Sequence, residues 1–406
     1  MRILQINVVY GVKSTGRTCL ETSNALKNAG HECFTAYGYG HSNDDHTYKI
    51  DNKVEYFFHN IMSRITGYQG YYSKNATIRL LEYIEKISPD IVHLRNLHAN
   101  YLNLPLLFEY LINNRIPVVL NLHDCWAFTG KCAYYSDINC DKWKTECNDC
   151  PVLKQYPQSL IFDRTNKLFN DKKKWFSLIE NLTVIGVSDW VADQAKMSFL
   201  GNRDIYTVYN WVNRNIFKAY PDSVFPKYNV DDSKFIVLGV SASWTKGTSR
   251  YEDFIKLSSM ISEDMEIVLI GEKTDNEKFP PNIKHIDYLD NTIELAKFYS
   301  SADVYVHLGT EDTFGKVIAE AMACGTPVIA NNSTVYPEIV GSGCGYIVEK
   351  RCVQDMYDKI CIIRDKGKEN YSSNCISWVK EKFDYYTNTS QLLSIYNQIL
   401  DKYSIE

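Results

Sequence analysis

The strongest constraint on the fold is a repeated alternation of short apolar runs with helical patterns. Ile3–Val9 is rich in β-branched residues and runs into a glycine turn, which predicts a buried strand. Arg17–Ala29 has the apolar spacing of a helix, and Gly30 is placed to end it. Strand alternating with helix favours parallel βαβ units, in which helices cover both faces of a sheet. The sequence therefore predicts an α/β fold.

The alternation occurs twice along the chain, which predicts two doubly wound domains. A chain of 406 residues is long for one compact core, because a domain typically takes about 150 residues. The segment Asn210–Val230 has two prolines and little periodicity, so we expect it to link the two halves. The predicted strands are Cys33–Tyr37, Asp90–Leu94, Val118–Leu122 and Leu182–Val187 in the first half, and Phe235–Val240, Ile267–Ile270, Val304–His307 and Val328–Ala330 in the second.

Charge and hydropathy exclude several classes of protein. The net charge of −5 argues against a nucleic-acid binder held by a basic surface. No run of 18 apolar residues predicts a membrane span, and Gln5 and Asn7 interrupt the apolar N-terminus that a signal peptide would need. We therefore expect a cytoplasmic protein, in which the twelve cysteines are thiols rather than disulfides.

The first candidate site is the loop Gly11–Arg17, between a predicted strand and a predicted helix. Its small residues allow close backbone approach, and a helix N-terminus favours an anion. The loop is neither a P-loop nor G-x-G-x-x-G, which disfavours a dinucleotide oxidoreductase. An ordinary βα turn is the alternative interpretation.

The second candidate site is the segment Glu311–Val328, which follows the predicted strand Val304–His307. Acidic residues come just before a helix whose amides point back at them, and Asp312 or Thr313 could cap that helix. Glu320 lies within its apolar part and needs a hydrogen-bond donor, which a ligand rich in hydroxyl groups would supply. The alternative is a capped helix with a solvated glutamate.

This segment carries a family resemblance. Seven residues separate Asp312 from Glu320, and Ala-Met-Ala-Cys-Gly-Thr-Pro-Val follows. The block resembles the E-x7-E signature of retaining glycosyltransferases of the GT-B fold, family 4. The resemblance covers nearly the whole chain, and its other landmarks are the Gly11–Arg17 loop, Val187-Ser188-Asp189-Trp190, Asn210 with Phe217, Lys246-Gly247, Tyr299–Ala302 and a crossing C-terminal helix.

The resemblance implies a domain plan. Residues 1–210 would form a Rossmann-like acceptor-side domain, and residues 211–382 a Rossmann-like donor domain. Residues 383–406 would form a helix that packs back on the first domain, which agrees with the amphipathic pattern of Ile376–Tyr403. Because doubly wound domains bind ligands at the carboxyl ends of strands, the active site is expected in a cleft between the domains.

The resemblance also implies residue roles. Asp312 would bind hydroxyls of the donor sugar, and Glu320 those of the ribose. Backbone amides of Phe314–Val317 would meet the diphosphate, and Lys246 would neutralise it as the glycosidic bond breaks. Gly16 would admit the phosphates or the sugar from the first domain.

Two departures from the family pattern need replacements. The family usually has Glu at Asp312, and the adjacent Glu311 could substitute. The family also has an arginine where this chain has Ser241, so Arg250 or Lys316 must supply that charge, and we hypothesise Lys316. The predicted donor-binding residues are Gly16, Arg250, Glu311, Phe314, Gly315, Lys316 and Glu320, and the predicted catalytic residues are Lys246, His123 and Asp312.

Three histidines lie at or just beyond the ends of predicted strands: His93, His98 and His123. In similar enzymes the histidine at the position of His123 lies near the donor sugar and is assigned to sugar binding rather than to proton transfer. The alternative for each is a core histidine that bonds a backbone carbonyl.

A cysteine-rich loop follows His123. The spacing Cys132-x7-Cys140-x6-Cys147-x2-Cys150 contains one zinc-knuckle pair, and the long loop needs a staple. We hypothesise a structural zinc bound by these four thiolates. Free thiols packed in an irregular loop are the alternative.

Two aromatic segments are candidate contact surfaces. Tyr68–Lys74 has tyrosine rings that could pack on an acceptor sugar, so Tyr68, Tyr71 and His98 are the predicted acceptor residues, with core packing as the alternative. Lys172–Phe176 mixes lysines with aromatic residues and could dock on an anionic membrane, although such a run is usually a solvated helix face.

The sequence thus predicts a retaining glycosyltransferase that uses a UDP- or GDP-sugar, with a glycan or a lipid-linked molecule as acceptor. No metal is expected in the chemistry, and no nucleic acid as partner. The resemblance places it in bacterial surface polysaccharide assembly, at the inner face of the plasma membrane. A nucleotide-sugar epimerase of the same fold and a non-catalytic nucleotide-sugar-binding protein are the alternatives.

Overall fold

The computed structural model describes residues 1–50, 53–274 and 278–403 and contains two compact units. Unit 1 comprises Met1–Val208 with Thr389–Glu406, and unit 2 comprises Tyr209–Asn388. Each unit is built on a parallel sheet with helices on its faces, which confirms the predicted α/β class. The sequence placed the domain boundaries at residues 210 and 382, so the C-terminal part of the chain joins unit 1 a few residues later than expected.

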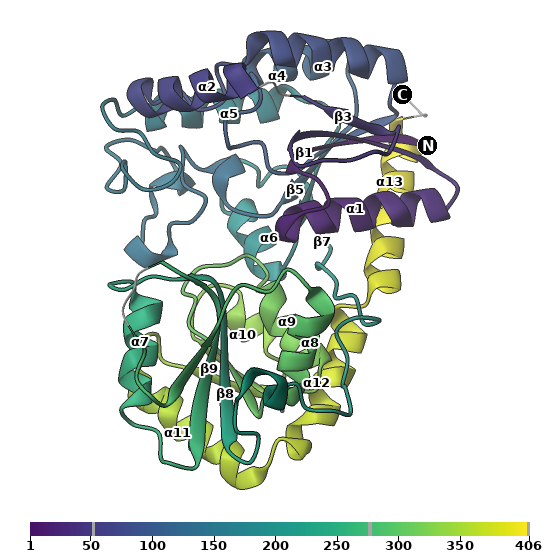
Figure 1. The fold of residues 1–406 in the computed structure, drawn as a ribbon. Coiled ribbons are helices and arrows are strands. Elements are labelled where there is room, and N and C mark those ends of the chain that lie inside the picture. The colour runs from purple at the N-terminus through teal and green to yellow at the C-terminus, as the bar shows by residue number, and fades with distance from the viewer. Residues whose placement is uncertain (51–52, 275–277, 404–406) are drawn as a thin grey trace. The chain divides into compact units, whose positions relative to one another are not determined.

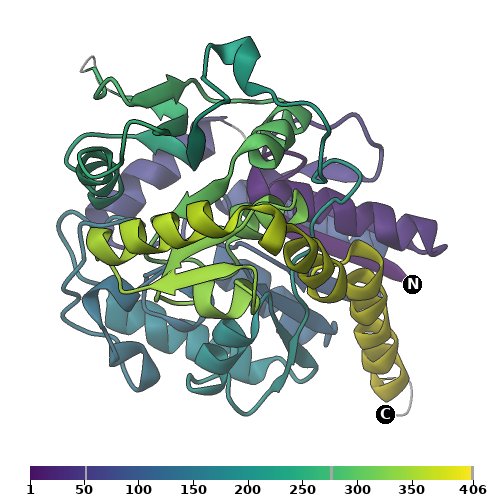
Figure 2. The ribbon, with the colours of Figure 1, turned by 90° about the horizontal axis from the view of Figure 1, so that it is seen from below.

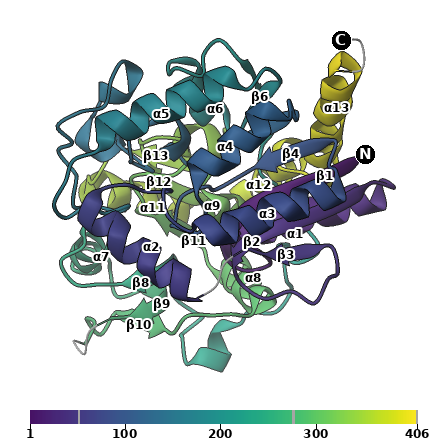
Figure 3. The same ribbon diagram turned by 90° about the horizontal axis from the view of Figure 1, so that it is seen from above.

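Unit 1 has a seven-stranded sheet in the order β3-β2-β1-β4-β5-β6-β7. Every residue of β4, β5 and β6 is buried, as expected for parallel strands covered on both faces. Figures 1 and 3 show α3, α4 and α5 on one face of this sheet and α1 on the other. Its strands are β1 (Arg2–Val9), β2 (Glu32–Tyr39), β3 (Thr47–Lys49), β4 (Ile91–Leu94), β5 (Val118–Leu122), β6 (Leu182–Gly186) and β7 (Asp204–Thr207).

The helices of unit 1 include several that the sequence pattern did not single out. Its α-helices are α1 (Lys13–Asn28), α2 (Lys53–Thr66), α3 (Lys74–Ile87), α4 (Leu104–Asn113), α5 (Thr165–Leu178), α6 (Asp189–Lys196) and α13 (Tyr385–Tyr403), with short 3-10 turns η1 (Trp126–Phe128), η2 (Ser136–Ile138) and η3 (Lys142–Lys144).

Unit 2 has a six-stranded parallel sheet in the order β10-β9-β8-β11-β12-β13. Its strands are β8 (Phe235–Trp244), β9 (Met265–Lys273), β10 (Ile283–Ile286), β11 (Val304–His307), β12 (Val328–Asn331) and β13 (Gly345–Val348), and its helices are α7 (Ser249–Ser258), α8 (Thr292–Ser301), α9 (Lys316–Ala323), α10 (Tyr336–Ile339), α11 (Val353–Lys366) and α12 (Glu369–Lys382), with the 3-10 turn η4 (Phe225–Tyr228).

Both sheets reverse their strand order at one point. In unit 1 the reversal lies between β1 and β4, and in unit 2 between β8 and β11. The crossovers leave in opposite directions there, so the loops after these strands flank a crevice that is the usual ligand position in doubly wound sheets. The two reversal points therefore locate the candidate site residues of each unit.

The C-terminal tail is two helices rather than the single one expected over Ile376–Tyr403. α12 ends at Lys382, and the Asp384 carboxylate accepts hydrogen bonds from the amides of Tyr386 and Thr387 at the start of α13. Asp384 thus caps α13 and separates the two helices. Figure 2 shows α13 following α12 and reaching the side of α1 near the N-terminus.

α13 completes the core of unit 1. Leu392, Ile395 and Tyr396 join one buried cluster with Ile3 of β1 and Ile91 of β4. The Tyr396 hydroxyl lies 2.5 Å from His93 Nδ1. His93 is completely buried here, so it is the core histidine of the alternative interpretation, although its partner is a tyrosine and not a carbonyl.

The first βα turn differs from the prediction. α1 begins at Lys13, four residues before the expected Arg17, so most of the predicted loop is helical. Gly11 has a φ of 71°, and its amide donates to the carbonyl of Gly16 at 3.0 Å, which tightens the turn. The chain enters the helix earlier because Gly11 tolerates the left-handed conformation.

The run Lys172–Phe176 lies on α5 and is only partly solvated, because Lys173 and Lys174 are exposed. Lys172 and Phe176 are buried, and the Lys172 ammonium donates to the carbonyl of Trp126 at 2.6 Å. Two of the five residues in this run therefore belong to the core, and membrane docking by the exposed Lys173 and Lys174 stays a prediction. Among the helices of the described residues, none combines the length and apolarity that crossing a bilayer requires.

Truncation of a buried α13 side chain tests the contribution of this helix. Ile395→Ala leaves a cavity under the sheet, so we expect the free energy of unfolding to fall by about 2–5 kcal/mol. The exposed Asn397→Ala on the same helix is the control and should cost under about 0.5 kcal/mol. Urea denaturation measures both, and equal losses would contradict the role of α13.

Candidate active site

The candidate site of unit 2 lies at the carboxyl ends of β8 and β11. Thr245–Thr248 connects β8 to α7, and Leu308–Gly315 connects β11 to α9. These two strands flank the reversal point, so their loops meet at the same edge of the sheet. All predicted donor residues except Gly16 belong to these two loops or to the helices that follow them.

Asp312 is held by the amides before α9. Its Oδ1 accepts hydrogen bonds from the amides of Thr313 at 2.7 Å and Phe314 at 3.2 Å. Burial raises the pKa of Asp312, and these amides and the charge of Arg250 oppose the rise. These two hydrogen bonds fix the orientation of the carboxylate, and the residue as a whole is half-buried.

The loop that carries Asp312 is fixed by the end of β12. Asn331 donates to the carbonyl of Gly309 at 3.0 Å, and Ser333 donates to the carbonyl of Thr310 at 2.5 Å. A Cβ atom at Gly309 would lie 2.5 Å from His307 and 2.6 Å from the Tyr336 hydroxyl. Gly309 is therefore required for this loop to approach the rings beneath it.

Arg250 lies in the first turn of α7 and fills the gap left by Ser241. Its guanidinium donates a hydrogen bond to the Ser241 hydroxyl. Its charge acts on Asp312, Tyr305, His307 and Tyr336, as the pKa changes of all four show. Arg250 thus lies beside position 241, and the choice between Arg250 and Lys316 as the replacing cation stays a prediction.

A buried ring network supports this site. The Tyr305 hydroxyl lies 3.0 Å from Nδ1 of His307, and the Tyr336 hydroxyl lies 3.2 Å from Nε2. Burial lowers the pKa of His307 to about 3, and Arg250 adds to this effect. His307 is therefore neutral at physiological pH and links β11 to α10.

The remaining predicted donor residues differ in how far they are exposed to solvent. Glu320 is 3% exposed on α9, and its charge acts on Tyr305 together with that of Asp312. Lys246 is exposed in the loop after β8, whereas Glu311 and Lys316 are half-buried. The Phe314 ring is buried against Phe383, so Phe314 can offer a ligand only its backbone, and Gly315 is the N-cap of α9.

In unit 1, Gly16 lies inside the first turn of α1. A Cβ atom there would lie 3.1 Å from the Val9 side chain and 3.3 Å from the Gly11 amide. The glycine lets α1 pack tightly on the end of β1. No side chain caps α1 at Val12, so its first amides have no side-chain hydrogen bond of that kind.

His123 follows β5 and contacts an arginine that the sequence analysis missed. Arg95 Nη1 lies 3.1 Å from His123 Nε2, and Arg95 Nη2 donates to Thr22 at 2.8 Å. Because a guanidinium only donates, Nε2 is the acceptor and the ring proton of a neutral His123 belongs on Nδ1. Arg95 comes directly after β4, and this position at a strand end is the signal that could have revealed it.

His98 forms a second polar group with Asp124. Its Nε2 lies 2.7 Å from Asp124 Oδ2, and its Nδ1 lies 2.9 Å from the Tyr156 hydroxyl. Asp124 also accepts from the Trp126 amide at 2.8 Å. Burial alone would raise the pKa of Asp124, but His98 and the amide lower it overall, so Asp124 stays ionised.

The predicted acceptor tyrosines Tyr68 and Tyr71 contact each other. The Tyr71 hydroxyl donates to Asp171, and its ring lies 5.1 Å from that of Tyr68. Burial, with Asp171 adding to it, raises the pKa of Tyr71. Gln69, which lies between these tyrosines in the chain, lines a polar cavity of about 120 Å³, whereas Tyr68 and Tyr71 do not. The residues that line it are Tyr56, Asn60, Ser63, Arg64, Gln69, Ala99, Asn100, Tyr156, Pro157 and Gln158.

The four cysteines of the zinc hypothesis line one small cavity. Cys132, Cys140, Cys147 and Cys150 surround about 20 Å³, and the Gly130 amide donates to Cys147 Sγ at 3.2 Å. Within residues 1–50, 53–274 and 278–403, however, no three or more His, Cys, Asp or Glu side chains are placed to hold a metal ion. The zinc site therefore stays a prediction, which zinc analysis of the purified protein tests.

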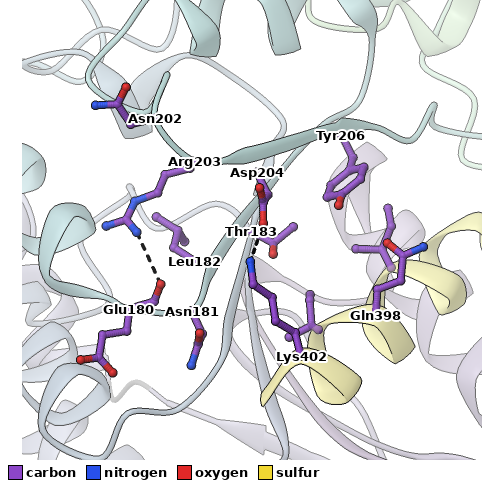
Figure 4. A pocket seen from close by; sticks show the side chains of 12 residues that line it. Glu180, Asn181, Leu182, Thr183, Asn202, Arg203, Asp204, Tyr206, Gln398 and Lys402 are labelled. Atoms are coloured by element: carbon purple, nitrogen blue, oxygen red, sulfur yellow. Dashed lines mark hydrogen bonds and ion pairs between the residues drawn. The ribbon is translucent and has the colours of Figure 1, made fainter. Parts of the chain in front are cut away.

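Another cavity of unit 1 lies at the opposite edge of the sheet from these groups. It measures about 390 Å³ and lies at the amino ends of β6 and β7, beside α13. Figure 4 shows Arg203 reaching the Glu180 carbonyl and Lys402 paired with Asp204 across it. Doubly wound sheets bind ligands at the carboxyl edge, so this cavity is not the candidate site.

Comparison with known proteins identifies related sequences along most of the chain. The family model described as "Glycosyl transferases group 1" matches residues 224–375, and "Glycosyltransferase Family 4" matches residues 15–215. A putative colanic acid biosynthesis glycosyl transferase, WcaC of Escherichia coli K12, is 24% identical over 86% of this chain and 88% of its own.

Solved structures share the fold at low sequence identity. Sucrose-phosphate synthase from Thermosynechococcus elongatus has a TM-score of 0.71 at 16% identity and covers 99% of both chains. Anabaena HepE, solved in complex with UDP-glucose, has a TM-score of 0.65 at 16% identity and covers 98% of this chain and 100% of its own. These neighbours establish the GT-B fold.

The buried His307 predicts a specific pH dependence. Its pKa is about 3 in the folded protein and about 6.5 ordinarily, so the unfolded chain binds the extra proton between these values. Stability should be full above pH 6.5 and fall by up to about 1.4 kcal/mol per pH unit below it. In His307→Gln this contribution is absent.

Urea unfolding of the wild type and of His307→Gln at pH 7, 6, 5 and 4 measures the difference. We expect the stability advantage of the wild type to shrink as the pH falls. The exposed His41→Gln should keep a constant difference from the wild type. Parallel curves for wild type and His307→Gln would contradict the assignment.

Proposed function

Because the chain belongs to the group 1 glycosyltransferases of family 4, we propose that it transfers a sugar from a nucleotide-diphosphate sugar to a glycan or lipid-linked acceptor, with retention at the anomeric carbon. The observation that carries this proposal is the fixed Asp312 carboxylate with Arg250 and the buried Glu320 around the end of β11. Acceptors for sugar and ribose hydroxyls thus lie beside a cation suited to a diphosphate.

The proposed reaction needs no general base from the protein. The bond between the anomeric carbon and the diphosphate oxygen breaks while the acceptor oxygen bonds to the same face of the sugar. The acceptor proton passes to the leaving phosphate oxygen. Arg250, Lys246 and the amides at the start of α9 would stabilise the charge that develops on the diphosphate.

His123 fits a sugar-binding role in this scheme. Its Nε2 faces Arg95, and a proton on Nδ1 makes it a hydrogen-bond donor to a sugar oxygen. Arg95 would act as a positioning residue, since it fixes the orientation of the imidazole. These contacts support sugar binding and give His123 no free lone pair for proton abstraction.

The acceptor is proposed to bind on unit 1. The polar cavity lined by Tyr56, Asn60 and Tyr156 joins the His98–Asp124 pair through the Tyr156 hydroxyl. Its size and polar lining suit one sugar or a phosphate group of a larger acceptor. The similarity to a colanic acid glycosyl transferase supports a setting in bacterial surface polysaccharide assembly.

A panel of UDP- and GDP-sugars tests the proposed function. The donor should raise the thermal unfolding temperature, because a ligand that binds only the native state stabilises it. NMR of the product should show the donor's anomeric configuration retained. Isomerisation of the donor alone would indicate an epimerase, and binding without transfer or hydrolysis would indicate a non-catalytic nucleotide-sugar-binding protein.

Arg250→Ala tests the proposed diphosphate cation. We expect kcat/KM to fall by about 10²–10³, because a fixed cation is lost where negative charge develops. Lys256→Ala removes an exposed charge from the last turn of the same helix and should leave kcat/KM within about twofold. If Lys316→Ala lost activity and Arg250→Ala did not, Lys316 would supply the cation.

A further inference from the structure

The outward face of α2 is apolar. Val54, Phe57, Phe58, Ile61 and Ile65 are 78%, 67%, 54%, 41% and 39% exposed. Their spacing of three or four residues places them on one side of the helix. The opposite side packs inward through His59 and Ser63, which are buried. α2 therefore turns its apolar stripe to solvent and its polar residues to the protein, the reverse of an ordinary surface helix.

A neighbouring loop extends this surface. Leu160, Ile161 and Phe162 are 52%, 61% and 48% exposed. The Leu160 amide donates to the carbonyl of Arg64 at 2.7 Å, which ties the loop to the last turn of α2. We name the surface formed by these two segments the α2 patch. It contains eight of the eighteen large apolar residues that the described part of the chain exposes.

The charges around the α2 patch are mainly basic. Lys53 and Arg64 are exposed on α2, and Arg164 lies 5.4 Å from the Phe162 ring. Among the residues that the structure describes, Glu55 and Asp163 are acids near this patch, and both have internal partners: Glu55 accepts from the Ala76 amide, and Asp163 accepts from the Cys150 amide. The whole chain carries a net charge of −5, so this surface differs in sign from the protein as a whole.

The inner edge of the same helix lines the polar cavity. Tyr56, Asn60 and Arg64 face it from α2, and Tyr156 and Gln158 face it from the segment just before the exposed loop. The apolar patch and the proposed acceptor cavity thus share one helix and one loop. A lipid-linked acceptor has a polar head group attached to a hydrocarbon chain. Its head group would match the polar cavity, and its hydrocarbon chain would match the apolar patch.

We propose that the α2 patch docks on an anionic lipid bilayer and thereby presents the polar cavity to the head group of a lipid-linked acceptor. A helix with an apolar stripe and flanking basic residues lies in the plane of the interface and buries its apolar side among the acyl chains. Anionic lipids attract the flanking lysine and arginine residues. The acceptor part of this proposal rests on the proposed function, and the docking part does not.

Vesicle sedimentation tests the docking. The probe is vesicles of phosphatidylethanolamine with phosphatidylglycerol, compared with vesicles of phosphatidylcholine alone. We expect the wild-type protein to sediment with the anionic vesicles. Val54→Ser/Phe57→Ser/Ile161→Ser should reduce the bound fraction by about tenfold or more, because three side chains lose their burial in lipid.

A matched variant controls for the loss of exposed apolar surface. Tyr288→Ser/Ile293→Ser/Tyr386→Ser changes three residues outside the α2 patch that are 58%, 48% and 73% exposed, and it should bind vesicles like the wild type. Both variants should keep the wild-type thermal shift with the nucleotide-sugar donor. Failure of the donor shift in the wild type would sink the proposed function and leave the docking result standing.

Two outcomes would overturn the docking proposal. Equal vesicle binding by the wild type and the α2-patch variant would show that these residues do not touch lipid. If light scattering showed a wild-type dimer that the α2-patch variant lost, and the wild type did not sediment with vesicles, the surface would be an interface between two copies of this chain.

Discussion

The reversal of strand order in each sheet is the constraint on which the candidate site depends. At β8 and β11 the two crossovers leave in opposite directions, so no helix covers the carboxyl ends of these two strands. The predicted donor-site residues of unit 2 are attached there. Lys246 and Arg250 follow β8, whereas Asp312 and Glu320 follow β11. Two connections and the helices that follow them therefore carry the predicted site of this unit.

Buried neutral side chains lie beneath the charged residues at this edge of the sheet. Arg250, Asp312 and Glu320 all act on the Tyr305 hydroxyl in β11, and His307 two residues later stays neutral. A protonated His307 would place a second buried positive charge near Arg250. Burying that charge would lower the free energy of unfolding, because the charge would lose its hydration. The low pKa of His307 avoids that cost and lets Tyr305 and His307 act as rigid supports.

The sequence predicts the repeating parts of this structure well and the long-range contacts poorly. All nine predicted strands coincide with observed ones because buried parallel strands are apolar runs. The contacts of Arg95 with His123 and of Arg250 with Ser241 were harder to predict, because they depend on packing between helix ends and strand ends. The sequence pattern also placed Lys172 on an exposed helix face. Its ammonium is instead buried and bonds a carbonyl, and a sequence does not distinguish such a lysine from a surface lysine.

α2 shows why apolar periodicity alone does not locate a core. Its stripe has the spacing of a buried helix face, and the sequence gives no sign of which side points inward. The inward side is instead fixed by hydrogen bonds: His59 bonds Ser73 at 2.8 Å and accepts from the Gly70 amide at 3.2 Å. Burial lowers the pKa of His59 to about 3, so this contact holds as a neutral one. A helix that is anchored by polar contacts can keep its apolar face exposed. Soluble monomers rarely expose such a large apolar patch unless it serves as an interaction surface.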